Sequence, residues 1–299
     1  MNIESLRYFY LIAKEGNISG VAKEVHLSQS ALSQQLQKLE SDLDKKLLIR
    51  SNRGVELTGA GQIVSKFAEN ILRTYDKMMK EIAETEKTAA VIKIVACQSI
   101  ADYALPCSLI KANDAYPNHK YELTSAMTSQ IISDVTNNIC DVGFTCDVDV
   151  SIDDPSVISM NVGQNNIVLI AKNEEGYPDM ITAEELINCC LITFTEKINI
   201  PNVLVKNLVR LGYDQSSLNC SLRVDGIESA KKLIHKKFGI AFLPYISVKE
   251  ELYKKQWKII KAPEFNMDLD ILMLYKRNCP DYVSDFVDWF KRDGSQSFC

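Results

Sequence analysis

Two short helical patterns separated by a few residues constrain the fold of this chain more than any other feature of its sequence. In the second pattern the leucines recur at the spacing of one helical face, at Leu32, Leu36, Leu39 and Leu43. The first pattern turns Val21, Ala22 and Val25 inward, and the small Ala22 lets two helices cross closely. We expect Ser19 to cap the first helix and Ser28 the second. The sequence therefore predicts a helix-turn-helix.

The outer side of the second helix carries hydroxyl and amide side chains. The residues concerned are Ser28, Gln29, Ser30, Ser33, Gln34 and Gln37. Such groups both donate and accept hydrogen bonds, as reading base edges in the major groove of DNA requires. A solvated polar face on a three-helix bundle fits the same residues, so this face alone leaves both interpretations open.

Two short extended runs follow within residues 47–58 and flank a turn at Asn52, Arg53 and Gly54. Glycine there supplies the positive φ that a tight hairpin needs. A basic hairpin beside a helix-turn-helix is the expected form of a wing, in which Arg50 and Arg53 contact phosphate or enter the minor groove. The alternative is a pair of ordinary surface arginines.

Thr58 is placed to cap a long amphipathic helix that reaches about residue 88. Its apolar stripe consists of Ile63, Phe67, Ile71, Tyr75, Met78 and Ile82, widened by Val64, Leu72 and Met79. A helix this long cannot bury such a stripe on the small domain before it, so we expect it to pair with a second copy. Docking on the chain's own C-terminal part is the alternative.

After residue 90, short β-rich runs such as 91–95 and 167–170 alternate with helical stretches. This order predicts βαβ units and a largely parallel sheet. No apolar run approaches the length that spans a bilayer, and the N-terminus lacks the apolar core of a signal peptide. We therefore expect a cytoplasmic protein without a membrane partner.

Charge and cysteine content exclude little by themselves. The net charge is −5, and residues 1–58 carry eight Lys and Arg against seven Asp and Glu, so charge alone would not indicate a nucleic-acid partner. The nine cysteines form no C-x-x-C and no metal-ligand spacing with the three histidines, so no metal or other cofactor is expected. We expect reduced thiols, while an oxidisable pair of Cys189 or Cys190 with Cys220 stays open.

Residues 6–61 closely resemble the DNA-binding region of LysR-type transcriptional regulators. The matching stretches are Leu6-Arg7-Tyr8-Phe9, Ala22, Ser28-Gln29-Ser30-Ala31-Leu32-Ser33, Leu39-Glu40 and Leu57-Thr58-Gly59-Ala60-Gly61. A weaker resemblance covers the rest of the chain, including residues 141–144 and 239–244. Ser30 stands where the family usually has Pro, Leu48 where Phe is common, and Gln34 where Arg is frequent. The last departure removes a positive charge from the reading face.

The resemblance implies a regulator that binds double-stranded DNA and is controlled by a small-molecule effector. It implies a winged helix-turn-helix at 1–58, a linker helix for dimerisation at 59–88, and an effector-binding domain at 91–299. That domain would resemble a type 2 periplasmic binding protein, with lobe one at 91–161 and 267–299 and lobe two at 162–266. A homotetramer built from such dimers is the family's commoner assembly.

The sequence supports the two-lobed domain independently of the resemblance. Residues 271–275 form the pattern of a strand that returns to lobe one. The final helix then carries a single apolar stripe, made by Tyr282, Val283, Phe286 and Phe290.

Ligands of open α/β sheets gather where strands end and helices begin. By this rule the candidates are Gln98, Ser99, Ile100, Thr193 and Thr195. The resemblance adds Thr128 and Ser129, which open a helix and resemble a contact segment of the family, and Phe242, on a strand that resembles the family's cleft floor. Ser99 can both cap the next helix and bind a ligand carboxylate, or serve only as a cap, and Phe242 belongs either to the cleft floor or to the core. Hydroxyls and amides with few charges favour a small anionic or zwitterionic effector.

Other functions fit less well. The sequence lacks a Walker A loop, G-x-G-x-x-G, H-E-x-x-H and G-x-S-x-G, so we do not expect an enzyme. A solute-binding component of a transporter would be exported and would lack a DNA-binding domain, whereas this sequence predicts a DNA-binding domain and no signal peptide. Thiol oxidation in place of a small ligand as the trigger remains an alternative.

Overall fold

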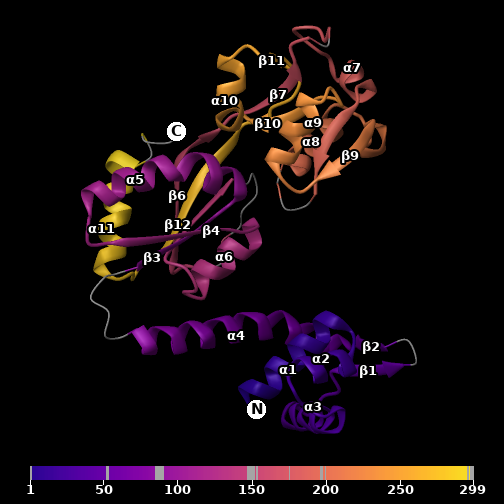
Figure 1. The fold of residues 1–299 in the computed structure, drawn as a ribbon, viewed down its shortest axis with the longest axis vertical. Coiled ribbons are helices and arrows are strands. Elements are labelled where there is room, and N and C mark those ends of the chain that lie inside the picture. The colour runs from indigo at the N-terminus through magenta and orange to yellow at the C-terminus, as the bar shows by residue number, and fades with distance from the viewer. Residues whose placement is uncertain are drawn as a thin grey trace. The chain divides into compact units, whose positions relative to one another are not determined.

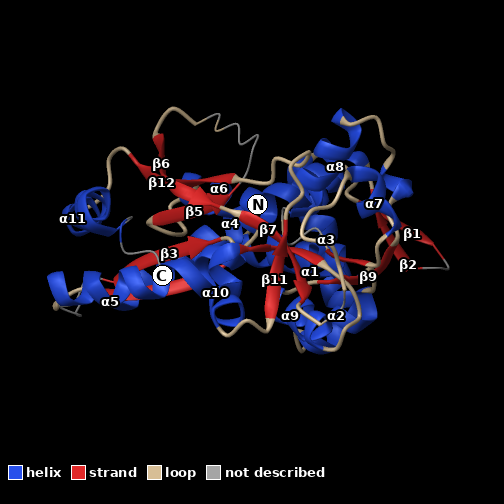
Figure 2. Ribbon diagram, turned by 90° about the horizontal axis from the view of Figure 1, so that it is seen from above, coloured by secondary structure: helices blue, strands red, loops and turns tan. Residues whose placement is uncertain are grey.

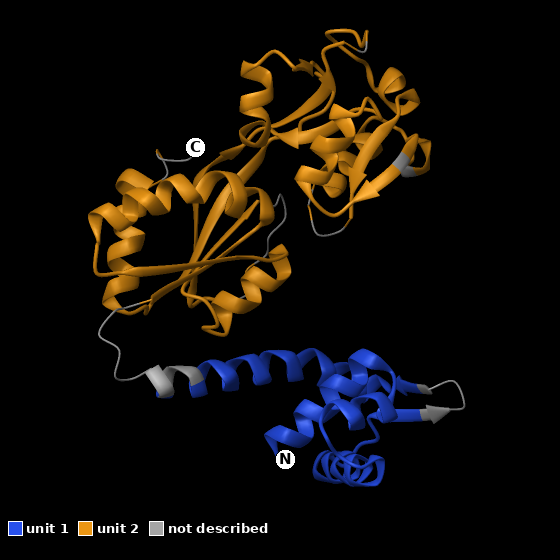
Figure 3. Ribbon diagram, viewed as in Figure 1, with its two compact units in different colours: residues 1–87 blue, residues 88–299 orange. Residues whose placement is uncertain are grey.

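The computed structural model describes residues 2–51, 54–84, 91–146, 152, 154–174, 176–195, 198, 200–294 and 296. The chain divides into two compact units, residues 1–87 and 88–299, each with its own hydrophobic core (Figure 3). Within the described ranges, no helix combines the length and the apolar character needed to cross a bilayer.

Helices α1 (Ile3–Glu15), α2 (Ile18–Glu24) and α3 (Gln29–Leu43) begin the first unit (Figure 1). The cap predicted at Ser28 is confirmed, because its Oγ accepts a hydrogen bond from the N–H of Ala31 at 3.1 Å. The cap predicted at Ser19 is wrong. Asn17 has the extended backbone of a cap, and its Oδ1 accepts from the N–H groups of Ser19 and Gly20. Ser19 therefore lies inside the first turn of α2.

The core of the first unit is formed where these helices cross. Its fully buried members are Phe9, Ile12, Ile18, Val21, Ala22, Leu32, Leu36, Leu39 and Leu47. In α1 the buried apolar side chains are Leu6, Phe9 and Ile12, whereas Tyr10 and Ala13 are only partly buried. The leucines of α3 anchor it from behind, as their spacing predicts.

A hairpin of β1 (Leu48–Ser51) and β2 (Gly54–Leu57) follows, paired antiparallel. Helix α4 (Gly59–Glu84) starts at the predicted cap, where Thr58 Oγ1 accepts from the N–H of Gly61 at 2.9 Å. A Cβ on Gly61 would lie 2.1 Å from the carbonyl oxygen of Leu47. Only glycine therefore lets α4 lie this close to the base of the hairpin.

Helix α4 carries apolar side chains on two sides. Ala68 and Leu72 are buried where α4 runs beside α1, and Arg7 on α1 pairs with Asp76 on α4 at 2.6 Å. Leu72 was expected to widen the pairing stripe, but it packs within its own unit. The other side is exposed at Ile63, Phe67, Ile71, Met78, Met79 and Ile82, by 42% to 62% of each residue.

Lobe one of the second unit contains a sheet with the strand order β4-β3-β5-β12-β6. Its strands are β3 (Val91–Ala96), β4 (Lys120–Ser125), β5 (Val142–Cys146), β6 (Val157–Asn165) and β12 (Leu269–Lys276). Of these, β3, β5, β12 and β6 are labelled in Figure 2, where strands are red. β3 is parallel to β4 and β5, whereas β12 is antiparallel to β5 and β6. The sheet is thus mixed rather than largely parallel, because β12 returns from lobe two in the opposite direction. The returning strand predicted at 271–275 is confirmed within β12.

Helices cover both faces of this sheet. On one face lie α5 (Leu105–Ala115), preceded by a π-helical turn at Ile100–Ala104, and α11 (Asp281–Trp289). On the other face lies α6 (Thr128–Thr136), against Val95 and Leu274. The stripe predicted for the last helix is confirmed at Val283, Phe286 and Phe290, which are fully buried; Phe290 opens a final π-helical turn, Phe290–Gly294.

In lobe two, β7 (Ile167–Lys172) lies between β10 (Ala241–Pro244) and β11 (Trp257–Ile260), antiparallel to both. β8 (Leu191–Phe194) is parallel to β9 (Cys220–Val224). The helices are α7 (Ala183–Asn188), α8 (Ile200–Arg210), α9 (Ile227–His235) and α10 (Tyr245–Tyr253), with a short 3-10 turn at Gln215–Ser217. A Cβ on Gly239 would lie 2.2 Å from the Cys190 carbonyl oxygen, so glycine lets the two segments meet.

Asn166 separates β6 from β7, and β12 begins at Leu269. β6 remains paired with β12 as far as Asn165 and Leu269. Strand pairing therefore carries lobe one beyond residue 161, the limit chosen from the sequence, and we propose Asn166 and Asp268 as the passages between the lobes.

Thiol chemistry differs from expectation at one residue. Among the described residues, the cysteines that form no disulfide are Cys97, Cys140, Cys146, Cys189, Cys190, Cys220 and Cys279. Cys107, in contrast, is disulfide-bonded, although all thiols were expected to be reduced. The expectation rested on the absence of an export signal, whereas a disulfide depends on which sulfur atoms the fold brings together.

Candidate DNA-reading face and effector cleft

The polar side of α3 lies on the surface of the first unit. Ser28, Gln29, Ser30, Gln34 and Gln37 are exposed, and Ser33 is half-buried. Because Leu32, Leu36 and Leu39 are buried on the opposite side, the helix presents its hydroxyls and amides outward on a fixed support. The structure thus brings all the α3 candidates together on one helix. Arg50 belongs to β1, but its side chain, like the whole of Arg53, lies outside the described residues.

Glu40 fastens the hairpin to the end of α3. Its Oε1 accepts from the N–H of Leu47 at 2.9 Å and of Leu48 at 3.3 Å, and its Oε2 lies 2.7 Å from Lys46 Nζ. Burial acts to raise the pKa of Glu40, but the hydrogen bonds from Lys46 and the two backbone N–H groups outweigh it and lower the pKa. The carboxylate therefore stays ionised and holds the wing strand in place.

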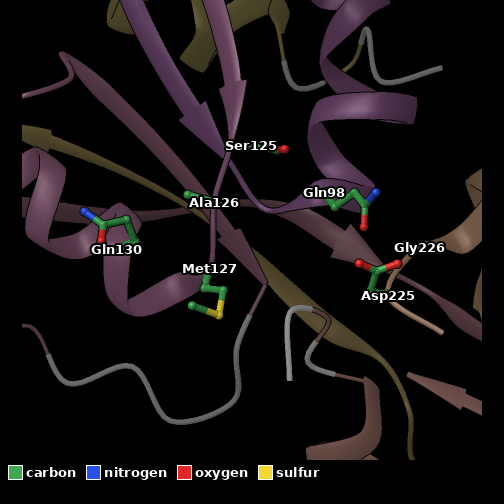
Figure 4. Close-up of a pocket in the computed structure, with 7 residues that line it drawn as sticks. All are labelled: Gln98, Ser125, Ala126, Met127, Gln130, Asp225 and Gly226. Carbon is green, nitrogen blue, oxygen red and sulfur yellow. The ribbon is translucent and has the colours of Figure 1, made fainter. Parts of the chain in front are cut away.

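In the second unit, a cavity of 540 Å³ is lined by residues of both lobes (Figure 4). Lobe one supplies Gln98, Ser125, Ala126, Met127 and Gln130, and lobe two supplies Asp225 and Gly226. Gln98 lies just after β3 and Asp225 just after β9, so the ends of strands from different lobes face the same space. This is where an open α/β architecture is expected to hold a ligand.

An adjoining cavity of 660 Å³ extends into lobe two. It shares Met127 and Asp225 with the first and adds Thr193, Thr195 and Arg223. The Oγ1 atom of Thr195 is buried and has no hydrogen-bond partner among the described residues. A buried hydroxyl at a cavity wall retains the capacity to bind a ligand or a water.

Some predicted effector residues lie behind the cavities rather than on their walls. Ser99 is buried in helical conformation, makes no cap, and accepts from Asn165 Nδ2 at 3.4 Å, so the capping alternative is wrong. Ile100 is buried beside it. Thr128 Oγ1 lies 2.7 Å from Thr145 Oγ1 on β5, and the neighbouring Ser129 is exposed.

Phe242 lies in the core of lobe two. It is 3% exposed, and its ring packs against Phe265 with the ring centroids 5.9 Å apart. The cavities described above do not include Phe242 in their lining, so the structure favours the core alternative for this residue.

The sequence missed the contribution of the β9–α9 turn. Asp225 and Gly226 directly follow β9 and precede α9, which is the same strand-end signal that pointed to Gln98. Arg223 and Asp225 also bring charges of both signs to a lining that was expected to be poor in charge.

A chain of polar contacts, named here the inter-lobe bridge, joins the lobes through Tyr103, Glu228, Lys231 and Glu251. The Tyr103 hydroxyl donates to Glu228 Oε1 at 2.7 Å. Lys231 Nζ lies 3.1 Å from Glu228 and 2.9 Å from Glu251. Burial, aided by the Glu228 carboxylate, raises the pKa of Tyr103; burial of Glu228 is outweighed by the bonds from Tyr103 and Lys231, which lower its pKa.

A winged helix-turn-helix followed by a two-lobed α/β unit with a cavity between the lobes is the architecture of a DNA-binding transcriptional regulator. Residues 3–62 match the model of the bacterial regulatory helix-turn-helix proteins of the lysR family, and residues 85–295 match the LysR substrate binding domain. The chain therefore belongs to the LysR family of transcriptional regulators.

Individual relatives agree with this assignment. The HTH-type transcriptional regulator GltR of Bacillus subtilis (strain 168) is 31% identical over 170 residues, which cover 57% of this chain and 56% of GltR, so the match spans little more than half of that relative. A probable RuBisCO transcriptional regulator of Emiliania huxleyi is 25% identical over 95% of this chain and 92% of its own. The LysR family regulator CbnR has the same fold, with a TM-score of 0.69 at 18% identity over 98% of this chain and 99% of CbnR. All three of these relatives are named as transcriptional regulators.

Proposed function

We propose that α3 reads the base sequence of double-stranded DNA and that a small molecule in the cavity between the lobes controls the outcome. The first part of this proposal, DNA reading by α3, rests on the exposure of the α3 hydroxyls and amides over a row of buried leucines. CbnR, whose fold this chain shares with a TM-score of 0.68, has been solved in complex with its target DNA. A regulator that meets its operator in this way works in the cytoplasm.

The test of DNA reading compares affinity for the genomic fragment that the purified protein retains best with affinity for random duplex. Gln29→Ala and Ser33→Ala should each lower that ratio by about five-fold to a hundred-fold, since one good base contact contributes about 1–3 kcal/mol. Arg53→Ala should weaken binding to both duplexes and flatten the salt dependence. The exposed Gln256→Ala in the second unit is the matched control and should change nothing. Unchanged ratios for both α3 variants would refute this role for α3.

Pairing of two chains through α4 completes the proposal. Ile63, Phe67 and Ile71 are more than 40% exposed on one side of a helix whose other side is already buried. Because large apolar side chains in a regular row are costly to leave in water, we propose that a second copy covers them, and that such dimers assemble further into a tetramer. The two winged helix-turn-helix domains of such a dimer then contact two half-sites on the DNA.

Sedimentation velocity tests the pairing. Phe67→Glu should break the assembly into smaller species, because a carboxylate would be buried in an apolar seam. Tyr253→Glu, at a residue 88% exposed in the second unit, is the control and should keep the assembly of the unchanged protein. An oligomer that survives both Phe67→Glu and Ile71→Glu would exclude α4 as the pairing surface.

For the effector we propose a small zwitterion within the anionic or zwitterionic class expected from the sequence. Arg223 and Asp225 place both signs of charge at the joined cavities, and the unpartnered Thr195 hydroxyl offers a further hydrogen bond. Effector binding would change the angle between the lobes and, through the oligomer, the spacing of the heads.

A thermal-shift screen of amino acids, dicarboxylates and amines against the full chain tests this choice. Amino acids should raise the midpoint of the second unit, and Thr195→Val should reduce the rise, whereas Thr74→Val on α4 should not. A screen in which only dicarboxylates or only amines bind would refute the zwitterion. A screen with no binder of any class would refute the cavity as a site for such molecules.

A further inference from the structure

A pair of cysteines lies where the lobes meet, behind the residues that line the cavity. Cys97 directly follows β3, and Cys146 ends the neighbouring parallel strand β5. The N–H of Cys97 donates to the carbonyl oxygen of Phe144 at 2.9 Å, which holds the two strand ends side by side. Neither is in a disulfide, Cys97 is partly exposed and Cys146 is buried, and the two thiols are hydrogen-bond partners. We name them the thiol pair.

Hydrogen-bond donors converge on the sulfur of Cys97. They are the Cys146 thiol and the Ser99 hydroxyl, with Ser99 Oγ 3.8 Å from Cys97 Sγ. The backbone N–H groups of Ile100 and Cys146 also favour the thiolate, and the Ile100 N–H donates to the Cys97 carbonyl oxygen at 3.0 Å. Ile100 opens the π-helical turn that leads into α5. The hydrogen bond from Cys146 is the largest of the effects that lower the pKa of Cys97 and outweigh its burial.

Other free thiols of the chain are in different surroundings. The Cys189 thiol donates to the carbonyl oxygen of Glu185 at 3.4 Å, and burial raises its pKa. Burial also raises the pKa of Cys279. Reactivity toward oxidants follows the thiolate, so Cys97 is set apart from Cys189 and Cys279 by its donors.

The thiol pair also contacts both passages between the lobes. Asn165, the last residue of β6 before lobe two, donates from Nδ2 to Cys146 Sγ at 3.7 Å and to Ser99 Oγ at 3.4 Å. Ile271 on the returning strand β12 is the strand partner of Cys146. A cavity of 240 Å³ is lined by Ile100, Asn165 and Ile271, which neighbour the pair although neither thiol is itself in the lining, and it has room for several water molecules.

We propose that Cys97 and Cys146 form a reversible oxidation site for small hydroperoxides, and that the resulting disulfide stiffens the passage at Asn165. The Cys97 thiolate attacks one oxygen of the peroxide; the S–O bond forms, the O–O bond breaks, and hydroxide or alkoxide leaves. The sulfur is oxidised to a sulfenic acid while the peroxide is reduced. Cys146 then attacks that sulfur, its proton leaves with the sulfenic hydroxyl as water, and an S–S bond replaces the S–O bond. A dithiol reductant reverses the step.

The unchanged full-length chain provides the first test. It is treated with a few equivalents of hydrogen peroxide, its remaining thiols are alkylated, and it is digested without reduction for mass spectrometry. We expect the Cys97 and Cys146 peptides to be joined, and dithiothreitol to separate them. Recovery of both residues as alkylated thiols, or of Cys97 as a sulfinic acid with no joined peptide, would overturn the proposal.

Single-cysteine variants separate the two roles. Cys146→Ser should stop the reaction at a Cys97 sulfenic acid that dimedone traps, and Cys97→Ser should leave Cys146 unoxidised. Cys189→Ser is the matched control and should still form the link. In the unchanged protein at pH 7, iodoacetamide should modify Cys97 about tenfold faster than Cys189, because a larger fraction of Cys97 is thiolate. Equal rates, or a faster Cys189, would contradict the proposed activation.

Hydrogen exchange tests the mechanical part. After oxidation, amides of residues 157–172, which span the passage, should exchange about five-fold more slowly, the effect of about 1 kcal/mol of added local stability. If the disulfide forms but exchange in this segment does not change, the disulfide does not stiffen the passage at Asn165, and that part of the proposal is overturned.

Discussion

The reading face of the first unit belongs to one continuous helix, whereas the cavity of the second unit is assembled from segments far apart in the chain. Residues 28–37 share α3 and the leucine row that supports it. Gln98 and Asp225, by contrast, meet only because lobe one and lobe two face each other. A face made by one helix depends on local caps and a small core. A cavity made by two lobes depends on the angle between them, which makes it suited to sensing and sensitive to changes at the passages.

The largest expected effect tests whether the two units are stable independently. Leu36 is 2% exposed in the core of the first unit, so Leu36→Ala should cost that unit about 2–5 kcal/mol. Differential scanning calorimetry should show the transition of the first unit at lower temperature and that of the second unchanged. Leu186→Ala, in the core of lobe two, is the matched control with the opposite pattern. If either change moved both transitions equally, the units would not be energetically separate.

The next effect concerns the joint between α3 and the wing. At pH 7, Glu40→Gln should destabilise the first unit by about 2 kcal/mol, since it weakens charge-assisted hydrogen bonds to Lys46 and the hairpin. The folded state lowers the pKa of Glu40, so this stabilisation is present above the unfolded value of about 4.3 and is lost as pH falls through the lower folded pKa.

Urea unfolding of both proteins from pH 7 to pH 3 measures this dependence. The curves should converge toward the acid end. A difference that stayed constant over the whole range would mean that Glu40 acts by shape and not by charge.

A smaller effect is expected at the inter-lobe bridge. Tyr103→Phe removes the hydroxyl that donates to Glu228 at 2.7 Å and should cost about 1 kcal/mol of contact between the lobes. Amides of Ile227–His235 should then exchange about five-fold faster by mass spectrometry. Tyr253→Phe, at an exposed tyrosine, serves as the control. Identical exchange in the two variants would show that the bridge does not hold the lobes.

The smallest effect separates the cap that the sequence predicts from the cap that the structure has. Asn17→Ala should lower the stability of the first unit by about 0.5–1 kcal/mol, because the N–H groups of Ser19 and Gly20 lose their acceptor. Ser19→Ala should leave it unchanged within error. Thermal unfolding of the two variants decides between them, and a larger loss for Ser19→Ala would reverse the assignment.

Local signals made much of the first unit predictable. Ser28 and Thr58 cap helices as expected, and the leucine row of α3 is buried. The errors there are of one kind: Asn17 and Ser19 are both good caps, and only the backbone selects Asn17. Leu72 fits the periodicity of the exposed stripe, but periodicity does not predict that α1 packs beside it.

Prediction was weaker in the second unit because its features depend on long-range pairing. Periodicity indicates strands, but not that β12 returns antiparallel between β5 and β6. Strand ends pointed to Gln98, Thr193 and Thr195, which do line the cavities. The same rule pointed to Ser99, which is turned toward Asn165, because residue order does not tell which way a side chain points.

The close approach of Gly61 to Leu47 has a mechanical consequence. Thr58 donates from Oγ1 to the carbonyl oxygen of Lys46 and from its N–H to the carbonyl oxygen of Leu47. These two hydrogen bonds and the close approach of Gly61 hold the start of α4 against the base of the hairpin. Rotation of α4 about its own axis must therefore move the hairpin with it. A partner that binds α4 thereby sets the orientation of the winged helix-turn-helix attached to that helix.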